Sequence, residues 1–287
     1  MKKQEIHNAL HSVYLYLDNL LLDKGEAFKT VEDESLVKTT DDRHPDFEIW
    51  SSKYTQWVYD EDIVGATIPN SVEIDGIETS ISDDVRIDFQ YGRVFLANSG
   101  ATSVKASFSY KEANLYLFED NDEAMLEEAF KIADELYDDN GRQITTPPPH
   151  RYVAPMIVLS YAKEEESVYS LGGSKNTDFI LRAFILANSP YLAMGLTSLL
   201  AHTMNQCFPL IADQDDMPLD FYGGIKDGSF SYEDLVDKYK SNGHNYYIEK
   251  VNASPTAPIS RNRTKMFSSF VEFDIRRYLT SVAISTS

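Results

Sequence analysis

Residues 57–118 read WVYDEDIVGATIPNSVEIDGIETSISDDVRIDFQYGRVFLANSGATSVKASFSYKEANLYLF. Apolar and polar residues alternate over short runs, such as 85–89 and 104–110, as expected of strands that bury one face. Turn-forming residues separate the runs at Pro69-Asn70, Asp75-Gly76, Tyr91-Gly92 and Asn98-Ser99-Gly100, because these residue types favour tight reversals. The stretch therefore predicts a compact antiparallel β-meander, around which the rest of the chain is organised.

The chain before this stretch predicts one helix. Apolar residues recur at helical spacing over residues 4–22, including Leu10, Tyr14 and Leu17, as in an amphipathic helix. Such a terminal helix either joins the chain's own core or docks on a neighbouring subunit, and both interpretations stay open at this point. Residues 28–43 are polar and acidic, which predicts a loop or a lone hairpin.

A second helix and a boundary are predicted after the β-meander. Acidic residues at 119–123, an apolar stripe over 124–136 and Asn140-Gly141 are typical of a helix start, body and end. Prolines at 147–149 then exclude a helix interior or a central strand. We expect an acidic N-terminal half, residues 1–145, and a C-terminal half, residues 146–287, unless the two form one interleaved domain.

The second half predicts a mixed set of elements. In chain order they are a strand at 156–159, a loop through 164–174, helices at 176–187 and 191–206 broken by Pro190, a short helix at 231–239, and strands at 246–251 and 266–275 joined by a turn-rich arm at 254–263. The whole pattern predicts an α+β fold: an antiparallel β-sheet or sandwich unit with flanking helices and a helical hairpin in the second half.

The charge is unevenly distributed. The net charge is −20, and residues 1–140 hold 12 Lys and Arg against 31 Asp and Glu, leaving a net −1 for the rest. An acidic half repels a phosphate backbone, which argues against tight or sequence-specific DNA binding. The acidic half forms either a solvated surface, a surface past which nucleic acid moves without binding, or the contact surface for a basic partner.

No motif in the sequence indicates catalysis, a metal or a cofactor. The acidic run from Asp213 to Asp216 resembles a calcium loop, but Pro218 occupies the position that needs glycine, so an EF-hand is excluded. The glycine-rich run at 171–177 lacks the Walker spacing, and His202 with Cys207 is too small a set for zinc. A single cysteine allows no intrachain disulfide, and we expect neither a signal peptide nor a membrane span. We therefore expect a protein that is not an enzyme.

The end of the chain is locally basic. Its positive residues are Arg261, Arg263, Lys265, Arg276 and Arg277. In a closed ring, such a region of one protomer can lie against the acidic face of the next. The alternative is pairing with the acidic half of the same chain.

Two segments carry a resemblance to a known class of proteins. The first lies in residues 59–95 and contains GATIPNSVEIDG followed by VRIDFQYGRVF; the second is FSSFVEFDI at 267–275. They resemble β-rich parts of virion structural proteins of tailed bacteriophages. The resemblance implies a non-catalytic, ring-forming neck, head-to-tail connector or tail-terminator protein. Its partners would be copies of itself and other neck and tail proteins, with at most transient contact with passing DNA and none with a membrane; its place would be the virion, assembled in the host cytoplasm.

Two other functions stay open beside this one. The same β unit would also suit a baseplate or fibre-attachment adaptor. A carbohydrate-binding or hydrolytic β-domain is the third hypothesis, which exposed Trp50 and Trp57 in a groove with clustered tyrosines would favour.

Overall fold

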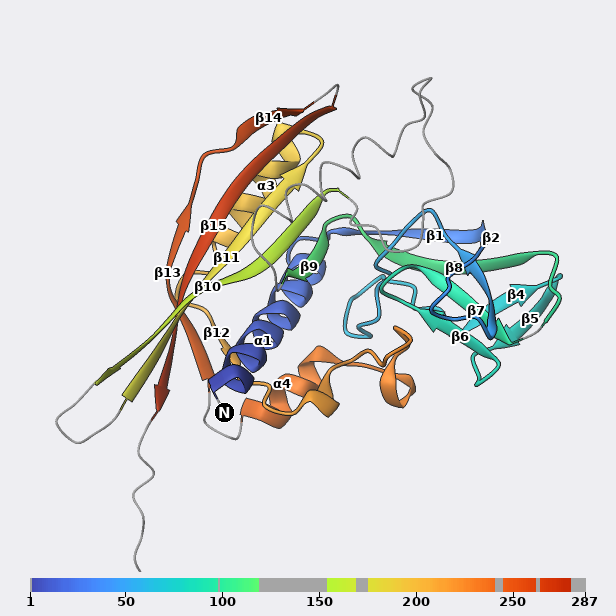
Figure 1. Ribbon diagram of the computed structural model, residues 1–287, viewed down its shortest axis with the longest axis horizontal. Coiled ribbons are helices and arrows are strands. Elements are labelled where there is room, and N and C mark those ends of the chain that lie inside the picture. The colour runs from blue at the N-terminus through green and yellow to red at the C-terminus, as the bar shows by residue number, and fades with distance from the viewer. Residues whose placement is uncertain are drawn as a thin grey trace, which may run out of the picture.

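The computed structural model (Figure 1) describes residues 2–97, 99–118, 154–168, 175–240, 245–261 and 264–279. Within these residues the fold is mainly β, with three largely antiparallel sheets and three α-helices. The helices are α1 (Lys2–Asp23), α3 (Pro190–Ala201) and α4 (Tyr232–Lys240), with 3-10 turns η1 (Gln214–Asp216) and η2 (Lys226–Gly228). The strands are β1 (Phe28–Ser35), β2 (Val37–Thr39), β3 (Phe47–Ser51), β4 (Ser71–Ile74), β5 (Ile77–Ser80), β6 (Val85–Asp88), β7 (Arg93–Ala97), β8 (Val104–Lys111), β9 (Asn114–Phe118), β10 (Met156–Val168), β11 (Lys175–Ala187), β12 (Cys207–Pro209), β13 (Asn245–Ala253), β14 (Ala257–Arg261) and β15 (Thr264–Leu279).

Two four-stranded sheets form what we call the β unit. Their strand orders are β1-β8-β4-β5 and β2-β3-β7-β6, and a shared apolar core joins them into a sandwich. Trp57 is fully buried there, and its ring stacks on Phe108 with centroids 3.8 Å apart. The Asp75-Gly76 turn closes the β4–β5 hairpin with positive φ at both residues, as the sequence predicts.

The third sheet, which we call the main sheet, is curled into a half-barrel (Figure 1). Its order is β12-β13-β15-β11-β10-β9, and β14 also pairs with β15. All pairs are antiparallel except β9 with β10. One face is covered by α1 and α3, and the burial of the aliphatic and aromatic side chains between them forms the largest core cluster.

Both helices of this layer follow from local sequence. The apolar stripe of α1 places Leu10 and Leu17 in the core beneath the main sheet, which favours the first of the two interpretations for this helix. Pro190, predicted to break a helix, instead begins α3, where its missing N–H costs nothing. The side chain of Ser189 caps the helix by accepting a hydrogen bond from the Leu192 amide.

The predicted helical hairpin is wrong. Residues 175–187 form the strand β11, so α3 has no helical partner before it. Phe179, Leu181 and Ile185 face α1 and α3, while Phe184 and Leu186 are buried on the opposite face. A central strand buried on both faces has a nearly continuous apolar sequence, and periodicity alone does not distinguish it from a buried helix.

Three loop predictions are also wrong. Residues 28–43 are not a loop or a lone hairpin, because β1 pairs with β8 and β2 with β3, in different sheets. The glutamates at 164–166 continue β10, which pairs with β11 as far as Val168. The arm at 254–263 contains β14. In each case long-range pairing with a partner strand organises a polar segment, and the segment's own sequence does not reveal that partner.

Other predictions are confirmed, and some fall outside the described residues. The helices at 4–22 and 231–239 and the strands at 156–159, 246–251 and 266–275 are present. The predicted helix over 124–136, the proline run and the proposed boundary at 145–146 lie outside the described residues. Elements of both halves share one sheet, since β9 pairs with β10.

A closed joint connects the β unit to the main sheet. Lys111, at the end of β8, places its Nζ 2.6 and 2.7 Å from the two carboxylate oxygens of Asp18 on α1, and both residues are buried. The Tyr59 hydroxyl donates to the same carboxylate at 3.1 Å. Beside them, the buried Gln56 amide donates to the Leu115 carbonyl at 2.8 Å and accepts from the Leu115 N–H at 2.9 Å. This side chain therefore completes the hydrogen bonding of the outermost strand β9.

Candidate functional site

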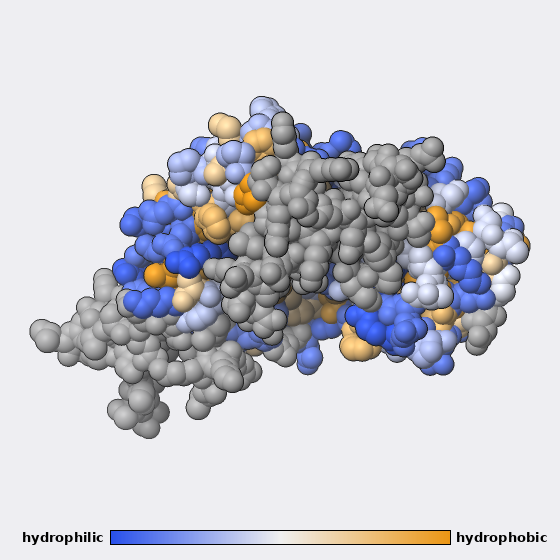
Figure 2. Space-filling model, turned by 45° about the horizontal axis from the view of Figure 1, so that its top comes forward, coloured by the Kyte–Doolittle hydropathy of each residue, from blue (hydrophilic) through white to orange (hydrophobic). Residues whose placement is uncertain are grey.

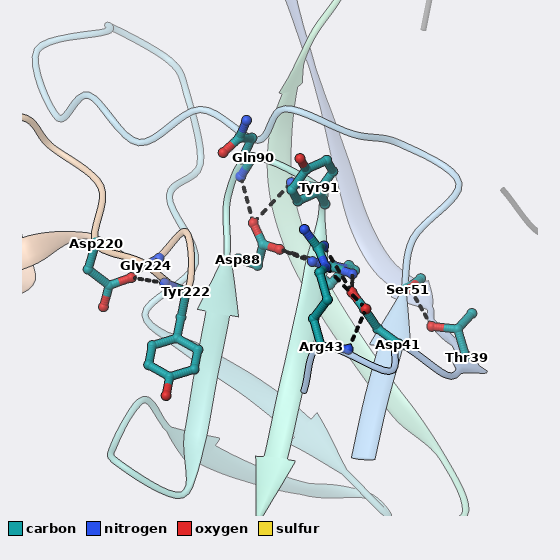
Figure 3. Close-up of polar contacts among 11 residues, drawn as sticks. Thr39, Asp41, Arg43, Ser51, Asp88, Gln90, Tyr91, Asp220, Tyr222 and Gly224 are labelled. Carbon is teal, nitrogen blue, oxygen red and sulfur yellow. Dashed lines mark hydrogen bonds and ion pairs between the residues drawn. The ribbon is translucent and has the colours of Figure 1, made fainter. Parts of the chain in front are cut away.

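A buried charge network lies at the end of the β6–β7 hairpin (Figure 3). Arg93 on β7 faces Asp88 on β6, its cross-strand partner, and donates to one carboxylate oxygen at 2.9 and 2.7 Å. The same guanidinium donates to Asp41 at 2.9 Å, and Arg43 donates to both oxygens of that carboxylate. Two carboxylates thus satisfy one buried cation, the arrangement that a buried charge requires.

The network fixes both the turn and the loop before β3. Asp88 also accepts from the amides of Gln90 and Tyr91, which holds the tight turn between β6 and β7. Burial opposes ionisation of Asp41, but hydrogen bonds from the Arg43 amide and from the Arg93 and Arg43 guanidinium groups hold the pKa of that carboxyl well below its usual range. Asp41 is therefore ionised at neutral pH. Burial raises the pKa of the Asp88 carboxyl, and the Arg93 guanidinium and the amides of Tyr91 and Gln90 oppose that shift. Together these contacts hold the turn and the loop in place.

A loop from the second half packs against this charge network. The Phe89 amide donates to the Gly223 carbonyl at 2.9 Å. Gly223 has φ +78°, and a Cβ there would overlap the Asp88 carboxylate, so the position requires glycine. Asp220 shapes the loop by accepting from the amides of Tyr222 and Gly224 at 2.8 and 2.9 Å. We call residues 218–228 the docking loop.

The docking loop presents two aromatic rings differently. The Tyr222 ring lies 4.7 Å from the guanidinium carbon of Arg86 on β6, a cation–π contact. Phe221 is 88% exposed, although its ring approaches His44 and Tyr222 at the edge. Figure 3 shows Tyr222 beside β6, with Asp220 and Gly224 next to it in the loop. A large aromatic side chain held in solvent by a loop with its own internal hydrogen bonds is typical of a contact residue.

Between the docking loop and the β unit is an open cleft of about 500 Å³. Its floor is apolar and includes Ile68, Ile81 and Ile225. Its rim is mostly acidic, with Glu61, Asp83 and Asp220, while Arg86 is the basic residue among the described lining. We call this feature the cleft; it combines apolar surface with negative charge, which suits an aliphatic or cationic group better than an anion.

The described residues hold no metal-binding cluster of three or more His, Cys, Asp or Glu side chains. The acidic run that resembles a calcium loop is engaged otherwise: Asp216 binds Lys238 and Tyr239, and Asp213 accepts from the Asp215 amide. In the part of the chain that the structure describes, no helix is long and apolar enough to cross a membrane.

The predicted contact residues fall in three places. Leu10, Tyr14 and Leu17 pack in the core beneath the main sheet. Arg276 pairs with Asp178 on β11 and Glu249 on β13, within its own sheet, and Arg277 is buried.

The rest of the basic region lies at the β14–β15 hairpin. Arg261 ends β14 and Lys265 lies near the start of β15, whereas Arg263 is outside the described residues. An inter-subunit role for these residues stays a prediction.

The sequence predicts an irregular loop over residues 213–228, which is confirmed, but it indicates neither the docking of this loop against the β unit nor the cleft beside it. The available signal was Phe221-Tyr222-Gly223-Gly224, two aromatics before two glycines in an otherwise polar loop. The pairing of Asp88 with Arg93 also follows from the predicted turn at Tyr91-Gly92.

No known protein family model matches this sequence, and no curated protein sequence shows significant similarity to it.

Proposed function

We propose that this chain is a structural component of a tailed-phage particle, a ring-forming neck, connector or tail-terminator protein at the head–tail junction through which DNA passes. The observation that carries the proposal is the outer surface of α3. This helix contains no charged residue in its twelve positions, and it exposes Tyr191 at 84% and Met194 at 61%, with Leu192 beside them.

An uncharged helix surface of this kind has the composition of an interface core, which is depleted in charge and enriched in Tyr and Met. Hydrophobic residues reach the surface among hydrophilic ones on the side formed by the main sheet (Figure 2). A protein that works as one copy usually covers such a helix with charged side chains. Assembly with further copies gives this surface a function.

The charge distribution supports the conduit role. The first half carries nearly all of the net charge of −20. In a ring with this half toward the lumen, the acidic surface repels the DNA backbone and lets it pass without strong binding. The location in the virion, the other neck and tail proteins as partners, and the absence of catalysis belong to the same proposal.

The carbohydrate-binding alternative lacks its distinguishing feature. Trp57 is fully buried and Trp50 is 6% exposed, so neither ring is available to stack on a sugar. A baseplate or fibre-attachment adaptor would use the same α3 surface, and its location in the particle distinguishes it from a neck protein.

The test is the mass of the purified protein at two concentrations, together with negative-stain images and its distribution between head, tail and free fractions of particles. We expect closed rings, or a monomer that joins the head–tail junction. Tyr191→Ser with Met194→Ser should abolish assembly, while Ser198→Ala on the same exposed helix should not. A monomer that joins no particle fraction at any concentration contradicts the proposal, and a position at the baseplate favours the adaptor.

A further inference from the structure

We propose that the cleft receives the β14–β15 hairpin of a second copy of this chain. This inference rests on the proposed function, because it names the contact by which one protomer of the ring would bind the next.

The hairpin is a cationic projection. β14 pairs with the first residues of β15, from Ala257 opposite Ser268 to Arg261 opposite Thr264, so two residues connect the strands. Residues 254–266 include Arg261, Arg263 and Lys265 and no acidic residue. Arg261, the last residue of β14, and Lys265, the second residue of β15, therefore bring two basic residues to the same end of the paired strands, in a chain whose net charge is −20.

The cleft has the complementary chemistry. Glu61 and Asp83 are exposed at its rim, and the Asp83 side chain is fully exposed. Arg86 weakens the negative potential only in part, because it already donates to the carbonyl and carboxylate of Asp83 at 3.1 and 3.4 Å and lies over Tyr222. Long cationic side chains place their methylene groups on apolar surface and their charges at a polar rim. The isoleucines of the cleft floor provide the apolar surface, and the carboxylates at its rim provide the negative charges.

The hairpin cannot fill the cleft of its own chain. In Figure 1 the end of β14 and the start of β15 lie at the far end of the main sheet, beside α3, whereas the docking loop and β6 lie on the other side of α1. A contact between two different surfaces of identical chains is heterologous, and it either closes into a ring or continues as a filament. Opposite charges on the two surfaces set the register and speed association.

The first experiment is cross-linking between copies. In a Cys207→Ser background, Asn70→Cys places a thiol at the cleft, and Asn262→Cys places one in the sequence between the end of β14 and the start of β15. We expect a short bismaleimide to join the two variants when they are mixed at high concentration. Lys24→Cys, exposed at the end of α1, is the matched control and should not cross-link to Asn262→Cys. The absence of a cross-link at every concentration overturns the inference. A cross-link from the cleft cysteine to another cationic protein, and not to the hairpin of a second copy, overturns it as well.

The second experiment reverses charges. Arg261→Glu with Arg263→Glu and Lys265→Glu gives a hairpin variant, and Glu61→Lys with Asp83→Lys gives a cleft variant. Each should reduce the cross-linked fraction by about tenfold or more, equivalent to losing about 1.4 kcal/mol. A chain with both sets, or a mixture of the two variants, should recover it. If both variants assemble as well as the original chain, the hairpin contact is wrong and the ring proposal stands. If the hairpin cross-links to the cleft but no ring or particle forms, the ring proposal fails and the contact stands.

Discussion

The β unit meets the rest of the chain at two joints that differ in how completely they are filled. At the closed joint, Lys111 and Asp18 are buried as an ion pair, and Gln56 satisfies both backbone groups of Leu115. At the open joint, the docking loop reaches the β unit through Gly223 but leaves a cleft of about 500 Å³ and an exposed Phe221.

The difference shows which joint sets stability and which is available for binding. Groups at the closed joint have lost water and depend on each other, so removing one partner leaves a buried polar group without a bond. The charged groups at the rim of the open joint remain in water, where substitution costs little. Substitutions at the closed joint should therefore destabilise the folded chain, whereas substitutions of exposed side chains at the open joint should mainly change association.

The largest expected effect is that of Lys111→Met. This change leaves the Asp18 carboxylate buried without its cation, and breaking a buried pair costs about 3–5 kcal/mol. Chemical denaturation at neutral pH measures the loss in free energy of unfolding. Lys111→Met combined with Asp18→Asn should recover much of it, because no uncompensated charge remains while the Tyr59 hydroxyl keeps an acceptor. A loss below about 1 kcal/mol for the single variant would show that Asp18 reaches water without Lys111.

Gln56→Leu should have the next largest effect. It keeps the volume close to that of the amide but leaves the buried Leu115 N–H and carbonyl without partners, which costs about 1–3 kcal/mol. Hydrogen exchange of the Leu115 amide is the direct readout and should accelerate. Gln56→Glu separates the two bonds: its carboxylate still accepts from the Leu115 N–H, so exchange of that amide should stay slow, but it loses the donor and adds a buried charge beside the Leu115 carbonyl, so the free energy of unfolding should fall. Unchanged exchange in Gln56→Leu would contradict the role given to this side chain.

The sequence predicts the local parts of this structure and misses the parts that depend on contacts between distant segments. The Asp75-Gly76 hairpin and α1 follow from turn chemistry and helical spacing over a few residues. The strand β11 is misread because its two faces are both buried. Nothing near Gln56 indicates that its amide will bond to a strand 59 residues away.

The candidate site shows the same division. Asp88 opposite Arg93 follows from a hairpin turn that the sequence predicts. The cleft does not, since its walls come from residues 61–89 and 220–228, and only the folded chain brings these together. The charge distribution in the sequence predicts a basic end and an acidic half. It does not indicate which acidic residues border the apolar floor of the cleft.

A pH-dependent prediction refines the comparison at the closed joint. Asp60 lies beside it and accepts hydrogen bonds from Asn19 on α1 and from the amides of Asp62 and Tyr232. Burial raises the pKa of Asp60 to about 6, although those hydrogen bonds oppose the shift and the neighbouring Asp62 carboxylate adds to it.

In the unfolded chain this carboxyl titrates near pH 4, so between about pH 4 and 6 the folded state binds more protons. The contribution of Asp60 to stability is therefore present below pH 4 and is lost as the pH rises through 6. Asp60→Asn should remove this part of the slope when the free energy of unfolding is measured across that range, with little loss at pH 7. The same slope in both proteins would show that Asp60 does not titrate in this window.

The smallest effect on stability is expected from Phe221→Ser in the docking loop, and this variant tests the open joint most directly. The ring is 88% exposed, so its removal should change the free energy of unfolding by less than about 0.5 kcal/mol. If the cleft binds a second copy, the same change should weaken self-association, because an exposed aromatic at a rim contributes to binding only when a partner covers it. Tyr222→Ser is the matched comparison and should cost more stability, since it removes the ring beside Arg86. A large loss of stability from Phe221→Ser would assign the ring to the packing of the loop, and unchanged association would exclude the loop tip from the contact. Either result would remove the distinction between a closed joint that sets stability and an open joint that is available for binding.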